Sequence, residues 1–107
     1  MMRKEQQLKY ELSFFDEAEE DYQRLDGSQL VFVDKGLNRI RAKGMEAGAP
    51  CHGNLEGCNK LKNRKMGLRI IFRQDKGKIN IISIVAIGYR RRSKVYKEAF
   101  NRINKKR

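Results

Sequence analysis

Three cations occur at every second position of one short segment: Lys60, Lys62 and Arg64. Side chains alternate between the two faces of a strand, so all three would project from one face, about 6.5–7 Å apart. Such a row could follow the backbone of a polyanion. Exposed lysines could equally serve to discourage edge-to-edge pairing of strands. The spacing alone leaves both interpretations open.

Two arginines lie on a segment that is otherwise strongly apolar: Arg69 and Arg73. A guanidinium in such surroundings is costly unless it is paired or solvated. The partner could be an acid of the chain, such as Glu56 or Asp75, or a substrate phosphate held in bidentate fashion. The cost of an unpaired guanidinium favours a phosphate-binding role for Arg69, and we expect a structural role for Arg73.

A third cationic group spans residues 90–96, with the sequence Arg-Arg-Arg-Ser-Lys-Val-Tyr. Four cations precede or enter a predicted helix N-terminus, where free N–H groups also attract phosphate. Tyr96 falls one turn into that helix, where a phenol beside cations can stack on a base. The alternative for Tyr96 is packing beside Val95 and Phe100.

Several kinds of chemistry are not supported by the residues present. His52 is the only histidine, which excludes a ribonuclease that uses two histidines. Cys51, His52 and Cys58 supply three ligands at a spacing that fits no familiar zinc template, so we expect no metal and no cofactor. The sequence also lacks a Gly-rich phosphate loop and paired carboxylates beside the cations. A nuclease of this composition would use Lys, Arg and Tyr.

The length and the charge distribution point to a small nucleic-acid-binding domain. The chain has 107 residues, which predicts a single domain over 1–107. Residues 1–30 carry four cations against eight acids, whereas residues 31–107 carry 21 cations against five acids. A segment this basic repels itself unless an anion is near, and nucleic acid is the commonest polyanion. A solvated basic surface is the alternative.

The sequence favours a cytoplasmic protein that does not enter membranes. The longest apolar-rich stretch, residues 79–87, is far shorter than the ~20 residues that span a bilayer. Residues 1–7 lead into no apolar signal core. Two cysteines are too few for the disulfide framework of a small secreted domain.

The periodicity of apolar residues predicts seven elements that position these groups. Gly36, inside the second helix, weakens that helix unless it is a site of close packing. Residues 44–57 contain four glycines and Pro50, and we expect a long connection there. The order β-α-α-β-β-β-α predicts an α+β fold, with an N-terminal helical hairpin on one side of a small antiparallel sheet and a C-terminal helix at its end. The expected strands cover 10–14, 60–64, 68–73 and 79–87, and the expected helices cover 16–25, 28–43 with Ser28 as N-cap, and 93–103 with Ser93 as N-cap.

From residue 10 to residue 103 the chain resembles the RelE branch of the RelE/ParE superfamily of type II toxin–antitoxin toxins. The resemblance implies a RelE-like fold with the order of elements given above. It also implies an endoribonuclease that enters the ribosomal A site, cleaves the messenger RNA codon there by 2′-hydroxyl attack, and so inhibits translation. The matching segments are 60–64 (Lys-Leu-Lys-Asn-Arg), 67–72 (Gly-Leu-Arg-Ile-Ile-Phe), 84–88 (Ile-Val-Ala-Ile-Gly) and 90–99 (Arg-x-Arg-Ser-x-Val-Tyr-x-x-Ala).

The resemblance implies a role for each matching residue. Lys60 and Lys62 match the lysines near the attacking 2′-hydroxyl, one of which is the general base. Arg69 matches the arginine that stabilises charge on the phosphorane, and Arg90 matches the one that protonates the leaving 5′-oxygen. Tyr96 matches the tyrosine that stacks on or orients the substrate nucleotide. Arg64 and Arg92 match further cations that hold RNA, and the cationic segment itself adds Lys94 to the residues expected to bind RNA.

The chain departs from the family pattern in three places. Tyr89 stands where a cation is frequent, Arg91 stands where an acid can occur, and the connection over 44–57 is longer than expected. These differences concern codon preference and contacts at the helix end. They leave the inferred reaction class unchanged.

Two other functions compete with the nuclease. A ParE-type toxin of the same superfamily would act on DNA gyrase, but such proteins generally lack the combined set of basic residues and tyrosine. A non-catalytic nucleic-acid-binding module would tolerate a change such as Arg69→Lys, whereas a catalytic site would not.

The resemblance also implies partners. A toxin requires a cognate protein antitoxin, with an acidic or amphipathic segment that covers the basic face or displaces the last helix. The ribosomal A site and its messenger RNA are the expected targets. Operator DNA would be bound only by the toxin–antitoxin complex.

Overall fold

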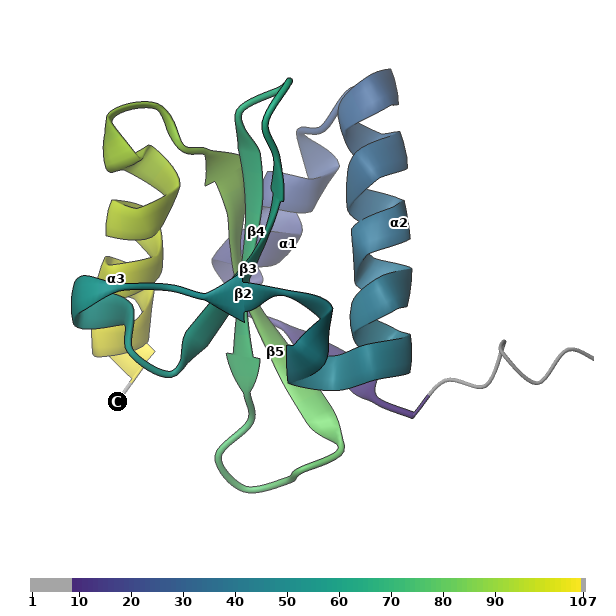
Figure 1. The fold of residues 1–107 in the computed structure, drawn as a ribbon. Helices are drawn as coiled ribbons and strands as arrows, with labels where there is room; N and C mark the ends of the chain where they lie inside the picture. The colour runs from purple at the N-terminus through teal and green to yellow at the C-terminus, as the bar shows by residue number, and fades with distance from the viewer. Residues whose placement is uncertain (1–8, 107) are drawn as a thin grey trace, which may run out of the picture.

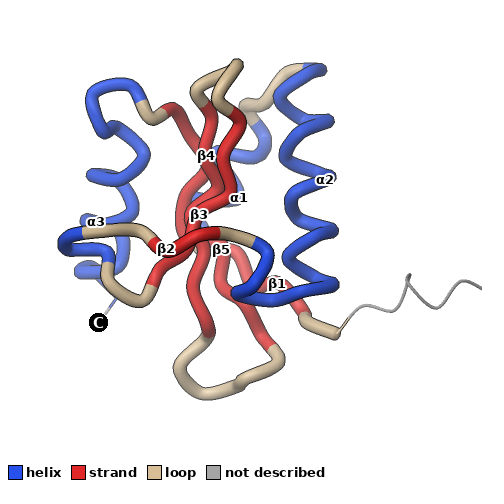
Figure 2. The backbone as a smooth tube through the Cα atoms, in the orientation of Figure 1, coloured by secondary structure: helices blue, strands red, loops and turns tan. Residues whose placement is uncertain are grey.

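The computed structural model describes residues 9–106, in which a five-stranded sheet is packed between helices (Figure 1, Figure 2). Residues 1–7, where we expect no signal core, lie outside this described part. No helix within it is long and apolar enough to cross a membrane. The main elements are β1 (Glu11–Phe14), α1 (Asp16–Gln23), α2 (Gly27–Lys43), β2 (Ala49–Pro50), β3 (Cys58–Asn63), β4 (Leu68–Gln74), β5 (Ile81–Tyr89) and α3 (Lys94–Lys106).

The sheet has the strand order β1-β5-β4-β3-β2. The α+β class and the order of the seven predicted elements are confirmed. Two features extend the prediction. The connection over 44–57 contains the two-residue strand β2, which pairs with β3. In addition, β1 runs parallel to β5, so the first and last strands in the chain are neighbours and the sheet is not antiparallel throughout.

Helices cover both faces of the sheet, with α2 and α3 on opposite sides (Figure 1). The prediction placed the last helix at the end of the sheet, whereas it packs flat on β5 and β4. The reason is that β5 carries apolar residues on both of its faces, and residues 82–87 are almost completely inaccessible to water. A strand of this kind is stable only when both of its faces are covered.

Gly36 is a close-packing site in the middle of α2. A Cβ atom at this position would lie 2.8 Å from Cδ1 of Ile70 and 3.3 Å from Cδ1 of Leu61. The side chains of β3 and β4 that point toward α2 therefore occupy the space that any larger residue would need. This contact explains why a residue that weakens a helix lies at its centre.

A buried ion pair ties α3 to the rest of the fold. Asp21 in α1 accepts hydrogen bonds from Nη1 and Nη2 of Arg102 in α3, at 2.7 and 3.2 Å, and from the backbone N–H of Ile87, at 3.0 Å. Arg102 also donates to the carbonyl oxygen of Val85, at 3.0 Å. Both charged groups thus have several partners, which is the condition under which a buried pair is stable.

The start of α2 differs from the prediction. Ser28 is not its N-cap, because the helix begins at Gly27 and Asp26 precedes it. The backbone N–H of Asp26 donates to Oε1 of Gln29, at 3.0 Å. A side chain three residues into the helix therefore satisfies a group at its entrance.

Candidate functional site

The candidate site lies on the face of the sheet that α3 covers. Lys62 pairs with Arg69 across β3 and β4, and Lys60 lies two residues from Lys62, so the three side chains leave the sheet on the same side. Tyr96 approaches them from α3. Residues from two strands and a helix, which are up to 36 positions apart in the sequence, thus meet at one place.

Arg69 is the centre of this group. It is buried, with 6% of its surface exposed. Its Nε donates to the hydroxyl oxygen of Tyr96, at 3.2 Å, and its Nη1 donates to the carbonyl oxygen of Leu68, at 3.0 Å. Within residues 9–106 no ion pair joins Arg69 to a carboxylate, and the carboxylate of Asp75 instead accepts the N–H groups of its own turn. A buried cation without a paired acid favours an anionic ligand.

The two lysines differ in their surroundings. Lys60 is half-buried, and its Nζ lies 6.0 Å from the centre of the Tyr96 ring, within the range of a cation–π contact. Lys62 is exposed. The pKa of Lys62 is lowered, above all by the charge of Arg64, then by partial loss of solvent and by the charges of Lys60 and Arg69. Like charges destabilise the protonated amine, so Lys62 loses its proton more readily than an isolated lysine.

A second basic group lies at the end of the sheet where β3, β4 and β5 turn. The predicted RNA-binding residue Arg64 and the segment 90–92 border one surface hollow of about 380 Å³. The backbone N–H of Arg90 donates to the carbonyl oxygen of Gly67, at 2.8 Å, and this bond fixes the loop against the β3–β4 turn. Arg92 and Ser93 adopt left-handed backbone conformations, with φ of 55° and 59°. Two such residues in succession are strained, and the arginines of segment 90–92 are exposed.

The structure separates Lys94 from Tyr96, although Lys94 borders a surface hollow together with Arg92. Lys94 and Tyr96 are about 200° apart around α3, so they leave the helix on different sides. Nζ of Lys94 lies 2.6 Å from Oε2 of Glu98, which compensates its charge. Ser93, expected as the N-cap of this helix, directly precedes its first residue and ends a short 3₁₀ turn over Arg91–Ser93.

Arg73 has the structural surroundings that its position suggested, although the partner is not an acid. Its guanidinium carbon lies 5.4 Å from the centre of the Phe15 ring. An aromatic face attracts a cation and shields its carbon stem from water. Arg73 is therefore accounted for without a ligand.

The two cysteines are buried neighbours in the connection that carries β2. The backbone N–H of Cys51 donates to the carbonyl oxygen of Cys58, at 2.9 Å. Both thiols are free, and burial raises the pKa of each, that of Cys58 to about 11. Residues 9–106 contain no group of three or more His, Cys, Asp or Glu side chains that could hold a metal ion.

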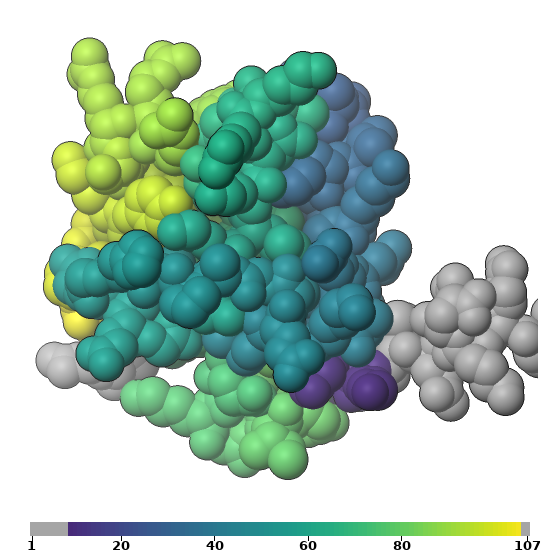
Figure 3. All heavy atoms as spheres, in the orientation of Figure 1, coloured from purple at the N-terminus to yellow at the C-terminus, as the bar shows by residue number. Residues whose placement is uncertain are grey.

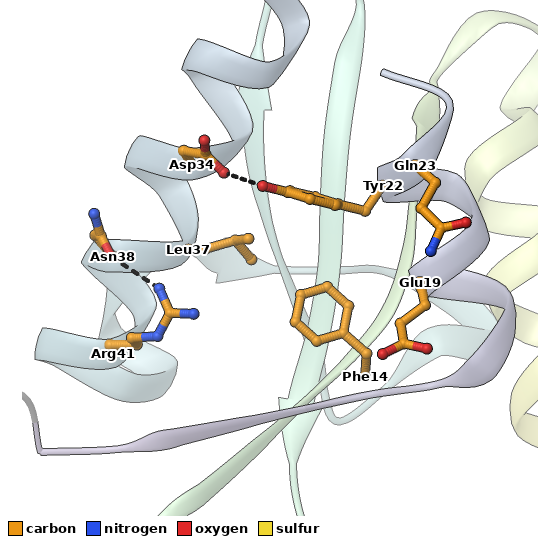
Figure 4. A pocket seen from close by; sticks show the side chains of 8 residues that line it. All are labelled: Phe14, Glu19, Tyr22, Gln23, Asp34, Leu37, Asn38 and Arg41. Atoms are coloured by element: carbon orange, nitrogen blue, oxygen red, sulfur yellow. Dashed lines mark hydrogen bonds between the residues drawn. The ribbon is translucent and has the colours of Figure 1, made fainter. Parts of the chain in front are cut away.

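A further hollow, of about 540 Å³, lies between α1 and α2 and contains none of the predicted site residues (Figure 4). Phe14 and Leu37 form its apolar floor. The hydroxyl of Tyr22 donates to Oδ1 of Asp34, at 2.7 Å, and this bond raises the pKa of Tyr22. The hollow is separate from the site formed by Lys60, Lys62, Arg69 and Tyr96, so the chemistry that those residues suggest does not take place there.

Sequence reasoning missed the pair that holds α3, and with it Tyr96, over the sheet. In the sequence, Asp21 is one of several acids near a predicted helix start, and Arg102 is one of many cations near the C-terminus. The two are 81 positions apart, and neither has an unusual neighbour in the sequence. No local signal distinguishes this aspartate from the acids beside it.

Comparison with known proteins adds independent information. No family model matches the chain. A relative described as a putative RelE-like toxin protein of Escherichia coli is 29% identical over 96 residues, which are 90% of this chain and 99% of that protein.

Solved structures show the same fold. A double arginine-to-alanine mutant of the E. coli toxin RelE in the free state matches with a TM-score of 0.72 and 26% identity, over 90% of this chain and 99% of that one. The isolated E. coli RelE toxin matches with a TM-score of 0.64 and 27% identity, over 88% and 98% of the two chains. The same mutant in complex with an antitoxin RelBc peptide matches with a TM-score of 0.66 and 25% identity, over 86% and 95%.

Proposed function

We propose that the chain, which is similar to RelE toxins in sequence and in fold, is a ribosome-dependent endoribonuclease that cleaves messenger RNA in the A-site codon. The observation that carries the proposal is the buried guanidinium of Arg69, which has a tyrosine hydroxyl as its side-chain partner and two lysines on the same face. This arrangement offers a phosphate both charge and directed N–H donors.

In the proposed reaction the 2′-hydroxyl of the RNA attacks its own phosphorus in line with the departing 5′-oxygen. A lysine amine removes the 2′ proton, and the 5′-oxygen leaves as a hydroxyl after it receives a proton. The products are a 2′,3′-cyclic phosphate and a 5′-hydroxyl end. The nucleophile belongs to the substrate, so this route needs neither a bound water nor a metal ion.

We assign the general base to Lys62 rather than to Lys60. A base must be unprotonated when it acts, and the cations around Lys62 lower its pKa. Lys60 instead contacts the ring of Tyr96, whose face attracts a cation. In this role Lys60 supports the position of Tyr96 and adds positive potential at the phosphate.

The remaining assignments follow from position. Arg69 would stabilise the charge that develops on the phosphorane, and Tyr96 would orient both Arg69 and the nucleotide. Arg90 would serve the leaving 5′-oxygen at the end of the sheet. Arg64 and Arg92, which border the same hollow, would hold the flanking phosphates.

Dependence on the ribosome has a physical reason. The site supplies charge and a weak base, but Lys62, Arg64 and Arg90 are all exposed to solvent. Aligning a nucleophile with its target contributes up to about 7–11 kcal/mol in favourable intramolecular cases. A ribosome that holds the codon in the geometry for attack would provide this contribution.

The proposal includes a protein antitoxin. One of the solved relatives is bound to an antitoxin peptide, and the basic face of this chain is an apt surface for an acidic segment. We further propose that operator DNA is bound only by the toxin–antitoxin complex and that the chain acts in the cytoplasm.

The proposal is tested by cleavage of a defined messenger programmed in the A site of purified ribosomes. The wild type should cut within the A-site codon, and Arg69→Ala should cut about 10²–10³-fold more slowly, as expected when a donor to the transition state is removed. Arg39→Ala removes an exposed cation of α2 and serves as the matched control with unchanged cleavage. An intact messenger at protein levels that arrest growth would contradict the proposal and favour gyrase as the target.

A further inference from the structure

Tyr89 is an exposed aromatic side chain surrounded by cations. All nine aromatic residues lie in the described part of the chain, and Tyr89 is the exposed one among them, with 44% of its surface accessible. It borders the hollow that Arg64 and segment 90–92 line. It also borders a larger one, of about 760 Å³, together with Arg91, Arg92, Lys94 and Lys97. Solvent and positive charge therefore surround an apolar ring at this end of the sheet.

The ring of Tyr89 is held in place from one side. Nε2 of Gln29, at the start of α2, donates to the Tyr89 hydroxyl, while Oε1 of Gln29 accepts the N–H of Asp26. Gln29 is therefore itself fixed by the helix entrance. An aromatic side chain whose hydroxyl is anchored loses little freedom when a ligand contacts its exposed surface.

The position of Tyr89 differs from that of the catalytic group. Tyr89 pairs with Leu68, and the neighbouring Gly88 pairs with Arg69, so Tyr89 and Arg69 point to opposite faces of the sheet. Figure 3 shows long side chains of the yellow-green segment between β5 and α3 standing clear of the surface. A strand of RNA that leaves the site past these cations would reach Tyr89 with a nucleotide other than the reacting one.

We propose that Tyr89 stacks on a nucleobase that flanks the cleaved nucleotide, so that the RNA site extends around the end of the sheet. This inference rests on the proposed RNA substrate. Single-stranded nucleic acids are bound by a cationic groove combined with an aromatic platform, and both are present here. Val31 and Ile79 are also exposed and apolar, but neither has an aromatic face.

The chain contains no tryptophan, which allows a direct test of base stacking. Tyr89→Trp introduces a single tryptophan, and its fluorescence is read on titration with a 2′-O-methyl oligoadenylate, which cannot supply the nucleophile. Ile79→Trp places the same probe at the 83%-exposed position in the β4–β5 turn. Inorganic polyphosphate serves as a polyanion without bases, and the anisotropy of a labelled oligonucleotide reports binding itself.

We expect the oligoadenylate to quench the Tyr89→Trp variant, polyphosphate to leave it unquenched, and the Ile79→Trp variant to respond to neither. In the second arm, Tyr89→Leu should weaken oligoadenylate binding about five-fold or more, while the dependence of affinity on salt keeps its slope. Tyr89→Phe keeps the ring but loses the hydroxyl that Gln29 anchors, so it should bind more weakly than the wild type and more tightly than Tyr89→Leu.

Three results would overturn the stacking role: no binding of the oligoadenylate, binding without quenching at position 89, or equal quenching by polyphosphate. The outcome is independent of the cleavage assay. Quenching without A-site cleavage would keep Tyr89 as an RNA contact and reject the nuclease. Cleavage without quenching would keep the nuclease and reject the extended site.

Discussion

The hydrogen bond between Tyr96 and Arg69 can be removed by deleting one atom. Tyr96→Phe keeps the ring beside Lys60 and removes only the oxygen that accepts the bond from Nε of Arg69. If this bond orients the guanidinium toward the phosphorane, the substitution lowers the rate of cleavage without removing any cation.

The expected size of the effect follows from the geometry. Hydrogen bonds to charged groups contribute about 1.5–3 kcal/mol. The bond is 3.2 Å long, at the upper end of the range for N–H···O bonds, so the lower figure applies. A loss of about 1.5 kcal/mol in the transition state corresponds to a rate about tenfold lower.

The assay is single-turnover cleavage of an A-site codon on programmed ribosomes, with a double-mutant cycle. Arg69→Ala alone is the slower variant, by about 10²–10³-fold relative to the wild type. Because the bond needs both partners, Tyr96→Phe should have no further effect in the Arg69→Ala background. Thermal unfolding of each variant checks that the fold is retained.

Additive losses in the cycle would refute this reasoning. They would mean that the Tyr96 hydroxyl acts on the RNA independently of Arg69. An unchanged rate for Tyr96→Phe would show that packing around the buried guanidinium is sufficient to orient it.

Three further predictions concern the base, the helix anchor and a backbone contact. The lowered pKa of Lys62 predicts a cleavage rate that rises with pH and levels off below the ordinary pKa of lysine. Arg64→Gln removes the largest cause of this lowering, so the pH–rate profile of the variant should move to higher pH. An unshifted profile would exclude Lys62 as the base. Asp21→Asn breaks the buried ion pair between Asp21 and Arg102 of α3. The free energy of unfolding, measured in urea, should fall by about 3–5 kcal/mol. A loss below about 1 kcal/mol would show that the pair is dispensable. Gly48→Ala would place a Cβ atom 2.3 Å from the carbonyl oxygen of Lys60. The substitution should therefore displace β3 and reduce both the stability of the fold and the rate of cleavage. Wild-type values for both would mean that β2 moves away without affecting the site.

The sequence by itself determined the elements and the residues that could do chemistry. Alternation and helical spacing are local properties, so the β-α-α-β-β-β-α order followed from them directly. The position of Arg69 on an apolar strand was enough to single it out, because a guanidinium there needs a partner.

Only the tertiary structure decided how these residues meet. Whether Arg69 pairs with an acid or with Tyr96, and whether Lys94 joins the site or pairs with Glu98, depends on the side of the sheet on which α3 packs. That choice is made by contacts between residues far apart in the chain, such as Asp21 with Arg102. The pKa of Lys62 is lowered chiefly by its sequence neighbour Arg64, and Arg69 on the adjacent strand β4 adds to this effect. Long-range contacts and electrostatic fields leave no periodic trace in a sequence, and for this reason the site had to be located in three dimensions.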